Sequence, residues 1–302
     1  MRTKENAGNS IKRAAKRKAL TERVMNILFF TCGLLAVVSV VFITLYMVVT
    51  GGPAILKIGV ADFLLGSEWS PENNVFGILP MILASLVATL VSVLIAVPIG
   101  VFVAVFLSHI AQKRLAAIVR PMIDLLSGIP SVVYGLLGAI LIVPMIFRLQ
   151  ESLSMPTGGC LLSAIIVLVI MILPTIISVS ETALRAVPRS YYEASMGLGG
   201  SKIQSIFRVV VPAARSGIVA GMVLGTGRAI GETMAVMMVA GNQTVIPEKI
   251  TDGVRTLTTN IVMEMGYSTD LHREALIATA VVLFVFILII NLSFSLLKRR
   301  SK

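Results

Sequence analysis

Charged residues are scarce in this chain of 302 residues, and their scarcity excludes a water-soluble domain. Only 14% of the residues are Asp, Glu, Lys or Arg, and 56% are hydrophobic, whereas a soluble domain has roughly a quarter charged residues. Apolar runs long enough to cross a hydrocarbon core of about 30 Å recur along the sequence. The alternating pattern of a membrane barrel is absent, so the spans must be helices. We therefore predict an all-α membrane protein.

Cysteine and histidine are almost absent, as are the motifs of metal and nucleotide sites. Cys32 and Cys160 have neither metal-ligand spacing nor a disulfide framework. His109 and His272 lie in different end regions without companion ligands. No G-x-x-x-x-G-K-[ST] loop occurs, and the glycine cluster at 197–200 lacks the Gly-Lys junction of such a loop. We expect no metal and no cofactor in this chain, and no enzymatic activity of its own.

Six membrane spans are predicted, at roughly 24–49, 76–108, 115–147, 160–183, 209–240 and 275–297. The second and third are longer than the ~20 residues that cross a bilayer, so they must tilt, kink or protrude. Four prolines are the natural break points: Pro98, Pro130, Pro144 and Pro174. A break inside the membrane frees a carbonyl that needs a partner or a water-lined cavity, which hints at a pathway. The alternative is that the prolines only shape helix packing.

The basic residues predict the orientation of the spans. The net charge is +11, and 20 of the 26 Lys and Arg residues fall in the first 23 residues or in loops and ends that share one side of a six-span topology. The positive-inside bias makes that side the cytoplasm, with both termini there. Residues 1–23 are then a basic cytoplasmic tail and 24–302 the transmembrane domain. No basic face with interleaved aromatics indicates a nucleic-acid partner.

A secretory signal is the competing interpretation of the N-terminal region. However, the apolar run Val24–Val49 is longer than the usual apolar region of about 7 to 15 residues and lacks a clear small-residue cleavage site. We therefore expect it to remain as a membrane anchor.

The segment 184–208, between the fourth and fifth spans, is short, polar and able to form helix. Residues 193–195 lie on one helical turn, and Gly199 and Gly200 break the helix. Apolar residues then recur at helical spacing: Ile203, Ile206 and Phe207. So short an amphipathic unit cannot bury its apolar face alone, which predicts that it docks in a groove on a partner.

The spacing in this segment resembles the EAA loop of ABC-importer permeases, whose pattern is EAA, three residues, G, nine residues and I-x-L-P. The matching residues are Glu193, Ala194, Ser195, Gly199 and, at the end of Val-Val-Val-Pro, Pro212. Ser195 replaces an alanine, and valines replace the isoleucine and leucine. The resemblance implies a coupling helix that sits in a cleft of a separate ATPase subunit. The alternative is an amphipathic loop helix that rests on the membrane.

Two charged residues, Arg228 and Glu232, fall inside the predicted fifth span. A charge near the bilayer centre costs at least ~2.5 kcal/mol and is tolerated mainly when it is paired or faces water. Their spacing of four residues allows mutual neutralisation on one helix. The functional hypothesis places both in a translocation path, where Arg228 offers planar donors to an anion and Glu232 positions it or competes with the anion. Nearby glycines predict a close helix-packing face: residues 217, 221, 225, 227 and 231.

Four longer stretches resemble phosphate-specific ABC importer permeases, and the first of them resembles the C-type subunit in particular. They are EWSPENNVFGILP (68–80), LLSGIPSVVYGLLG (125–138), ETALRAVPRSYYEASMGLG (181–199) and GTGRAIGETMAV (225–236). The likeness extends from about residue 20 to the end of the chain.

This resemblance implies a type I ABC importer permease fold in the bacterial cytoplasmic membrane. The implied partners are an A-type permease, an ATP-binding subunit dimer that hydrolyses ATP, an extracytoplasmic phosphate-binding protein and membrane lipid. Two alternatives stay open: a permease for another oxyanion such as molybdate or sulfate, and a membrane scaffold or sensor that transports nothing.

Overall fold

The structure is a computed structural model that describes residues 2–152 and 158–300. The chain divides into two compact units, 1–50 and 51–302. The first unit lies within the long helix α1 (Arg2–Ile58), which contains the predicted anchor. The second unit begins inside the same helix and contains every other element.

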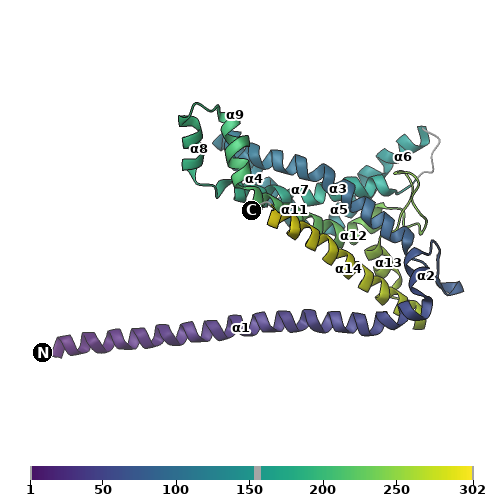
Figure 1. Cartoon of the computed structure of the whole chain (residues 1–302), viewed down its shortest axis with the longest axis horizontal. Coiled ribbons are helices and arrows are strands. Elements are labelled where there is room, and N and C mark those ends of the chain that lie inside the picture. Colours follow the sequence, from purple (N-terminus) through teal and green to yellow (C-terminus); the bar gives the residue numbers. More distant parts are fainter. Residues whose placement is uncertain (1, 153–157, 301–302) are drawn as a thin grey trace. The chain divides into compact units, whose positions relative to one another are not determined.

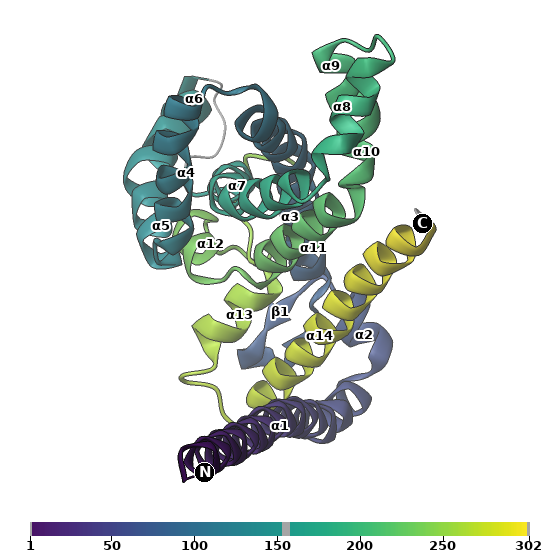
Figure 2. The same ribbon diagram turned by 90° about the vertical axis from the view of Figure 1, so that its left-hand side faces the viewer.

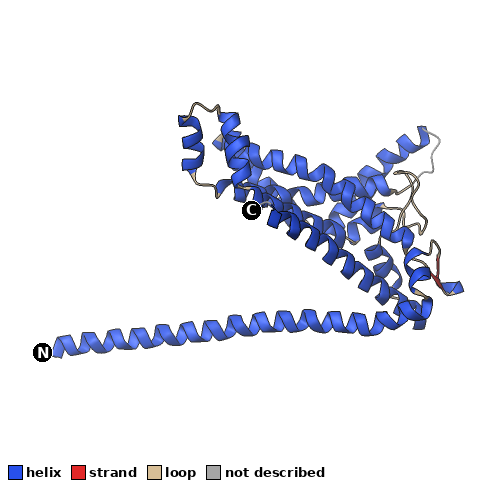
Figure 3. Ribbon diagram, viewed as in Figure 1, coloured by secondary structure: helices blue, strands red, loops and turns tan. Residues whose placement is uncertain are grey.

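The second unit is almost entirely helical, with one small hairpin (Figure 3). Its first half contains α2 (Val60–Leu65), β1 (Trp69–Ser70), a 3-10 turn (Pro71–Asn73), β2 (Val75–Phe76), α3 (Leu79–Val105), a π-helical turn (Phe106–Ile110), α4 (Lys113–Gly128), α5 (Ser131–Leu137), a second π-helical turn (Gly138–Ile142) and α6 (Val143–Ser152). Its second half contains α7 (Leu161–Arg185), α8 (Arg189–Gly197), α9 (Lys202–Ser205), a third π-helical turn (Ile206–Val210), α10 (Val211–Ala213), α11 (Arg215–Gly231), α12 (Met234–Val239), α13 (Leu257–Glu264) and α14 (Asp270–Arg300).

In the described residues, five helices are long and apolar enough to cross a membrane, and a bent pair makes up to six. The pair is Lys202–Ala213 with Arg215–Gly231, at an angle of 68°. The all-α membrane fold predicted from composition is therefore confirmed. The bend at Ala214 itself was not predicted.

Helix α7 is the centre of the second unit. Among the five candidate spans of the described residues it is the most buried, and its side chains Ile165, Leu168 and Ile172 lie in the core. Figure 2 shows α7 end-on, with α3, α11, α12 and the α4–α5 pair around it. The two ends of this unit differ: α8 and α9 lie at one end, and the hairpin with α13 lies at the other (Figure 1).

The predicted third span, 115–147, does not form a single helix, whereas Pro130, one of the four predicted break points, is confirmed as a break. The chain breaks between α4 and α5 at Ile129 and Pro130, and the segment long enough to cross a membrane is Ser131–Arg148. Proline lacks an N–H and clashes with the preceding turn, which ends α4. Pro98 and Pro174, by contrast, lie inside continuous helices.

Candidate translocation and coupling sites

The predicted coupling segment folds as two short helices joined by a glycine turn. Helix α8 begins after Pro188 and contains Glu193, Ala194 and Ser195. Gly199 then has φ +86°, a left-handed conformation that favours glycine. Helix α9 starts with a capping box, in which Ser201 accepts from the Gln204 backbone N–H at 3.3 Å and Gln204 accepts in return at 3.1 Å.

A serine pair holds the two short helices together. The Ser195 hydroxyl donates to the Ser205 hydroxyl at 2.8 Å, and the Gly200 N–H donates to the Ser195 carbonyl at 3.1 Å. Ser205 is buried. The serine that replaces the second alanine of the EAA pattern thus gains a bond that alanine could not make. Pro212, at the end of the pattern, lies in α10 and is exposed.

The tip of this segment exposes apolar side chains. Leu198 is 92% exposed and Ile203 is 63% exposed. The prediction that Ile203, Ile206 and Phe207 share one uncovered face is wrong for Ile206, which is fully buried in the core beside α3 and α4. Phe207 lies 6.4 Å from Phe102 between ring centroids. The apolar surface left uncovered is therefore the tip around Leu198 and Ile203.

A single carboxylate ties α4 to the end of α7. Glu181 Oε1 accepts from Arg120 Nε at 2.5 Å and from Arg185 Nε at 3.0 Å. Arg120 also donates to the Leu107 carbonyl at 2.9 Å, which attaches the end of the α3 span.

Arg228 lies near the C-terminal end of α11 and is half-buried. Its Nη1 donates to Thr175 Oγ1 on α7 at 3.4 Å. Helices α11 and α7 approach closely because three glycines face α7: a Cβ at Gly217 would meet Ala183, one at Gly221 would meet Val179, and one at Gly225 would meet Ile176. Gly227 and Gly231 face no described atom within 4 Å, so the predicted packing face includes only the first three glycines.

Glu232 does not continue the helix of Arg228, so the alternative that the two charges neutralise each other on one helix is wrong. Helix α11 ends at Gly231, and Glu232 is extended, with φ −71° and ψ 127°. Its Oε1 accepts from the Ala235 N–H at 3.0 Å in the first turn of α12. Within the described ranges no ion pair joins Glu232 to Arg228. The predicted fifth span, 209–240, is thus interrupted at Glu232 and Thr233.

Helix α12, which follows the interruption at Glu232, packs against helix α5, which follows the interruption after α4. A Cβ at Gly135 in α5 would lie 2.8 Å from Ala235 Cα in α12, so only glycine permits this approach. Tyr134 is buried beside it and donates to the Leu126 carbonyl of α4 at 2.8 Å. The two interrupted segments therefore lie side by side, and the freed backbone groups are partly satisfied by side chains.

A buried polar cluster at the hairpin end was not predicted. Glu264 of α13 is only 6% exposed and accepts from Trp69 Nε1 at 2.9 Å and from Arg255 Nη1 at 2.6 Å. His272 Nε2 lies 2.8 Å from the same carboxyl group. Glu264 thus joins three elements: the hairpin through Trp69, the loop that precedes α13 through Arg255, and α14 through His272. The single tryptophan of the chain was the available signal, but its partner is 195 residues away.

Comparison with known proteins identifies the family. The model of the family described as "Binding-protein-dependent transport system inner membrane component" matches residues 96–302. The chain belongs to this family. It is therefore a multi-pass inner-membrane component of a binding-protein-dependent transport system, and the ABC importer permease fold predicted from the EAA pattern is confirmed.

Two relatives are similar to this chain over most of its length. The probable ABC transporter permease protein YqgH of Bacillus subtilis is 37% identical over 270 residues, which are 86% of each chain. The phosphate transport system permease protein PstC of Xylella fastidiosa strain 9a5c is 34% identical over 278 residues, 85% of this chain and 86% of the relative.

Solved structures show the same fold at lower identity. A subunit of a bacterial alginate ABC transporter, solved in complex with its periplasmic protein, has a TM-score of 0.63 at 17% identity and covers 90% of this chain and 94% of its own. A chain of the inward-facing MetNI methionine ABC transporter has a TM-score of 0.58 at 21% identity, with 72% and 93% covered.

Proposed function

We propose that this chain is the C-type permease subunit of an ATP-driven importer of inorganic phosphate. The assignment of phosphate as the substrate rests on the 34% identity, over most of both chains, with a phosphate transport permease. Arg228 supports it independently, because a guanidinium offers planar, permanently charged donors to an oxyanion.

In this proposal Arg228 lines the translocation path. Among the described residues it makes one hydrogen bond, to Thr175, which is long at 3.4 Å, so most of its five N–H donors can serve an anion. Glu232 belongs to the same path because it shapes the interrupted chain beside Arg228. The path is completed by a homologous A-type permease, against which the exposed apolar faces of α4 and α5 can pack.

The coupling segment takes up movement from an ATP-binding subunit dimer. Glu193, Ala194, Ser195 and Gly199 shape the segment, and the exposed tip at Leu198 and Ile203 supplies the apolar contact. This chain holds no cofactor and hydrolyses no ATP, and a phosphate-binding protein docks outside. The C-terminus is cytoplasmic, since α14 ends at the same end of the second unit as α8 and α9 (Figure 1). The positive-inside bias places the basic residues 1–23 on the same side of the membrane.

Reconstituted vesicles that contain the complete transporter test the proposal. We expect ATP-dependent accumulation of labelled phosphate that a tenfold excess of unlabelled sulfate or molybdate does not displace. The matched control carries an ATPase without its nucleotide-site lysine. Accumulation of sulfate or molybdate in place of phosphate would assign another oxyanion. No ATP-dependent flux of any of the three would indicate a scaffold or sensor.

A further inference from the structure

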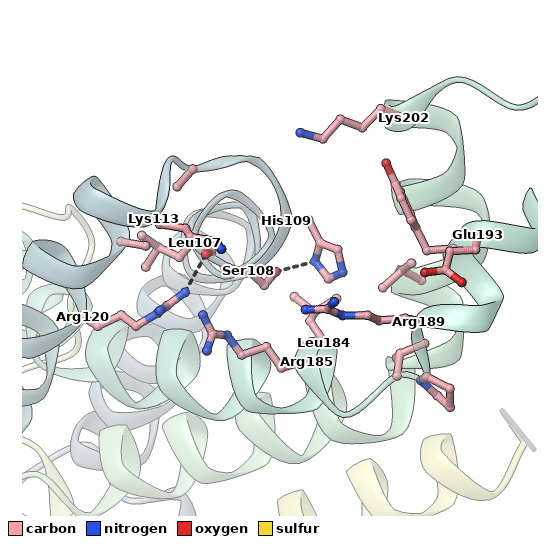
Figure 4. A pocket seen from close by; sticks show the side chains of 16 residues that line it. Leu107, Ser108, His109, Lys113, Arg120, Leu184, Arg185, Arg189, Glu193 and Lys202 are labelled. Atoms are coloured by element: carbon pink, nitrogen blue, oxygen red, sulfur yellow. Dashed lines mark hydrogen bonds between the residues drawn. The ribbon is translucent and has the colours of Figure 1, made fainter. Parts of the chain in front are cut away.

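A cavity of about 750 Å³ lies beside the coupling segment, apart from Arg228. Its walls come from four places: the end of the α3 span, α4, the end of α7 and the coupling segment. Figure 4 shows the basic side chains that line it. They are His109, Lys113, Arg120, Arg185, Arg189 and Lys202.

The charges in this basic cavity do not balance. Five of its lining residues are Lys or Arg, and Glu193 is the only acid among them. Glu181, which does not line the cavity, forms ion pairs with Arg120 and Arg185. Within the described part of the chain, Lys113, Arg189 and Lys202 have no ion pair.

The positive-inside bias explains why basic residues occur near this side of a membrane. It does not explain why they line one cavity, because flexible side chains of like charge lower their energy by spreading into water. In Figure 4, the side chains of His109 and Arg189 face the same cavity, and the Lys202 ammonium extends across the opening from the other wall. An anion in the cavity would remove this repulsion.

The donors also match one chemical class of anion. A phosphate group has only acceptor oxygens at its charged end, and guanidinium groups bind it through two parallel hydrogen bonds. Arg189 provides such a fork, and Lys113 and Lys202 add compact charges. Arg185 donates its Nε to Glu181, which leaves the two terminal nitrogens of its guanidinium for the phosphate group. Arg120 donates instead to Leu107 and Glu181, so it is held in place and shapes one wall.

We propose that the basic cavity binds a phosphate group, carried either by free inorganic phosphate or by an anionic lipid headgroup. The bound group bridges Arg189 and Lys202 of the coupling segment to Lys113 of α4 and Arg185 of α7. It thereby restrains the coupling segment against the helices that it must move. This site is distinct from the translocation path and stands whether or not the chain transports phosphate.

Binding of labelled inorganic phosphate to the purified full chain, in nanodiscs of phosphatidylcholine, tests the free-phosphate source. We expect Arg189→Gln/Lys202→Gln to raise the Kd by about tenfold or more, because two charge-assisted contacts are lost. Both side chains are exposed, so no packing is removed. The matched control is Arg208→Gln, an exposed cation of the same segment outside the cavity lining; its Kd should equal that of wild type.

Glu193→Gln provides a test of opposite sign. It removes the only acid of the lining and should tighten phosphate binding, a result that a folding defect cannot imitate. Arg228→Gln separates this site from the path, since it should leave cavity binding unchanged.

Nanodiscs that contain phosphatidic acid, followed by native mass spectrometry, test the lipid source. If retained phosphatidic acid falls in Arg189→Gln/Lys202→Gln and not in Arg208→Gln, the phosphate group is a lipid headgroup. The proposal is overturned if neither phosphate nor phosphatidic acid binds, if binding is unchanged in the double variant, or if only Arg228→Gln abolishes it.

Discussion

Arg228 reaches across the interface of α11 and α7 to Thr175, with 3.4 Å between Nη1 and Oγ1. The glutamate four residues further on does not hold it, because α11 ends between them. A charged group in a membrane span with one long hydrogen bond to a neutral hydroxyl is expected to have another partner, and an anion in transit is the partner that the proposed function supplies.

Arg228→Gln should abolish most phosphate uptake. Glutamine keeps one amide donor group and loses the charge, so we expect uptake to fall by at least about tenfold. Arg228→Lys should retain part of it, because lysine keeps the charge without the planar fork. Thr175→Val, the matched control, should stay within about twofold of wild type. The measurement is labelled phosphate uptake at limiting phosphate, in cells that lack this subunit and carry matched membrane levels of each variant. Equal uptake by Arg228→Gln and wild type would assign Arg228 to packing.

Two substitutions of Glu232 distinguish its role as a helix cap from a role of its negative charge. Its Oε1 caps the first turn of α12, and glutamine retains that acceptor without the charge. We expect Glu232→Gln to keep thermal stability and to retain phosphate uptake within about twofold. Glu232→Ala removes the acceptor and should destabilise the chain by about 1 kcal/mol. Loss of uptake in the stable glutamine variant would show instead that the path requires the negative charge.

Glu264 is expected to be a main determinant of stability at the hairpin end. Its replacement by alanine leaves Arg255, 14% exposed at its side chain, without a counter-charge. Breaking such a buried pair costs about 3–5 kcal/mol. Trp69→Phe keeps the ring contact with Phe76 but loses the bond to the carboxylate, at a cost of about 1.5–3 kcal/mol. Thermal unfolding in detergent measures both.

The control for the hairpin end is Glu72→Ala, which removes an exposed carboxylate of the same region. It should change stability by less than about 0.5 kcal/mol. If Glu264→Ala unfolds at the same temperature as this control, the cluster carries no stability.

Two glycines of α11 should respond oppositely to alanine. A Cβ at Gly217 would collide with the Cβ of Ala183 in α7, which cannot rotate away. Gly217→Ala should therefore cost about 1–3 kcal/mol and lower the unfolding temperature. Gly227→Ala meets no described atom within 4 Å and should be neutral or slightly stabilising. Equal effects of the two substitutions would contradict the α7–α11 packing seen here.

Local patterns predicted those parts of the fold that depend on neighbouring residues. The continuous apolar run 160–183 predicted α7 to within two residues at its C-terminal end. The spacing from Glu193 to Gly199 predicted the helix and the turn of the coupling segment.

The sequence could not predict features that depend on distant segments. The four-residue spacing of Arg228 and Glu232 implies contact only if the helix is continuous. The helix is interrupted at Glu232, just before the point where Ala235 packs closely against Gly135 of α5. The cluster at Glu264 joins residues up to 195 positions apart. The basic cavity is assembled by four segments whose charges, read along the chain, indicate only which side of the membrane they face.

Leu198 is the side chain on which we expect assembly with the ATPase to depend. At 92% exposure it contributes almost nothing to the core of this chain, and it lies on the turn before Gly199. Leu198→Asp should leave the unfolding temperature unchanged and reduce the amount of ATP-binding subunit that co-purifies with the complex by about tenfold, because burial of a leucine contributes about 1.5–3 kcal/mol. The matched control is Lys249→Asp, which changes an exposed loop residue outside the coupling segment. An exposed leucine of a membrane span, such as Leu94 in α3, is unsuitable because an aspartate there would face lipid. Co-purification of Leu198→Asp at the level of Lys249→Asp would mean that the ATPase binds elsewhere on this chain, and that the exposed tip rests on the membrane surface.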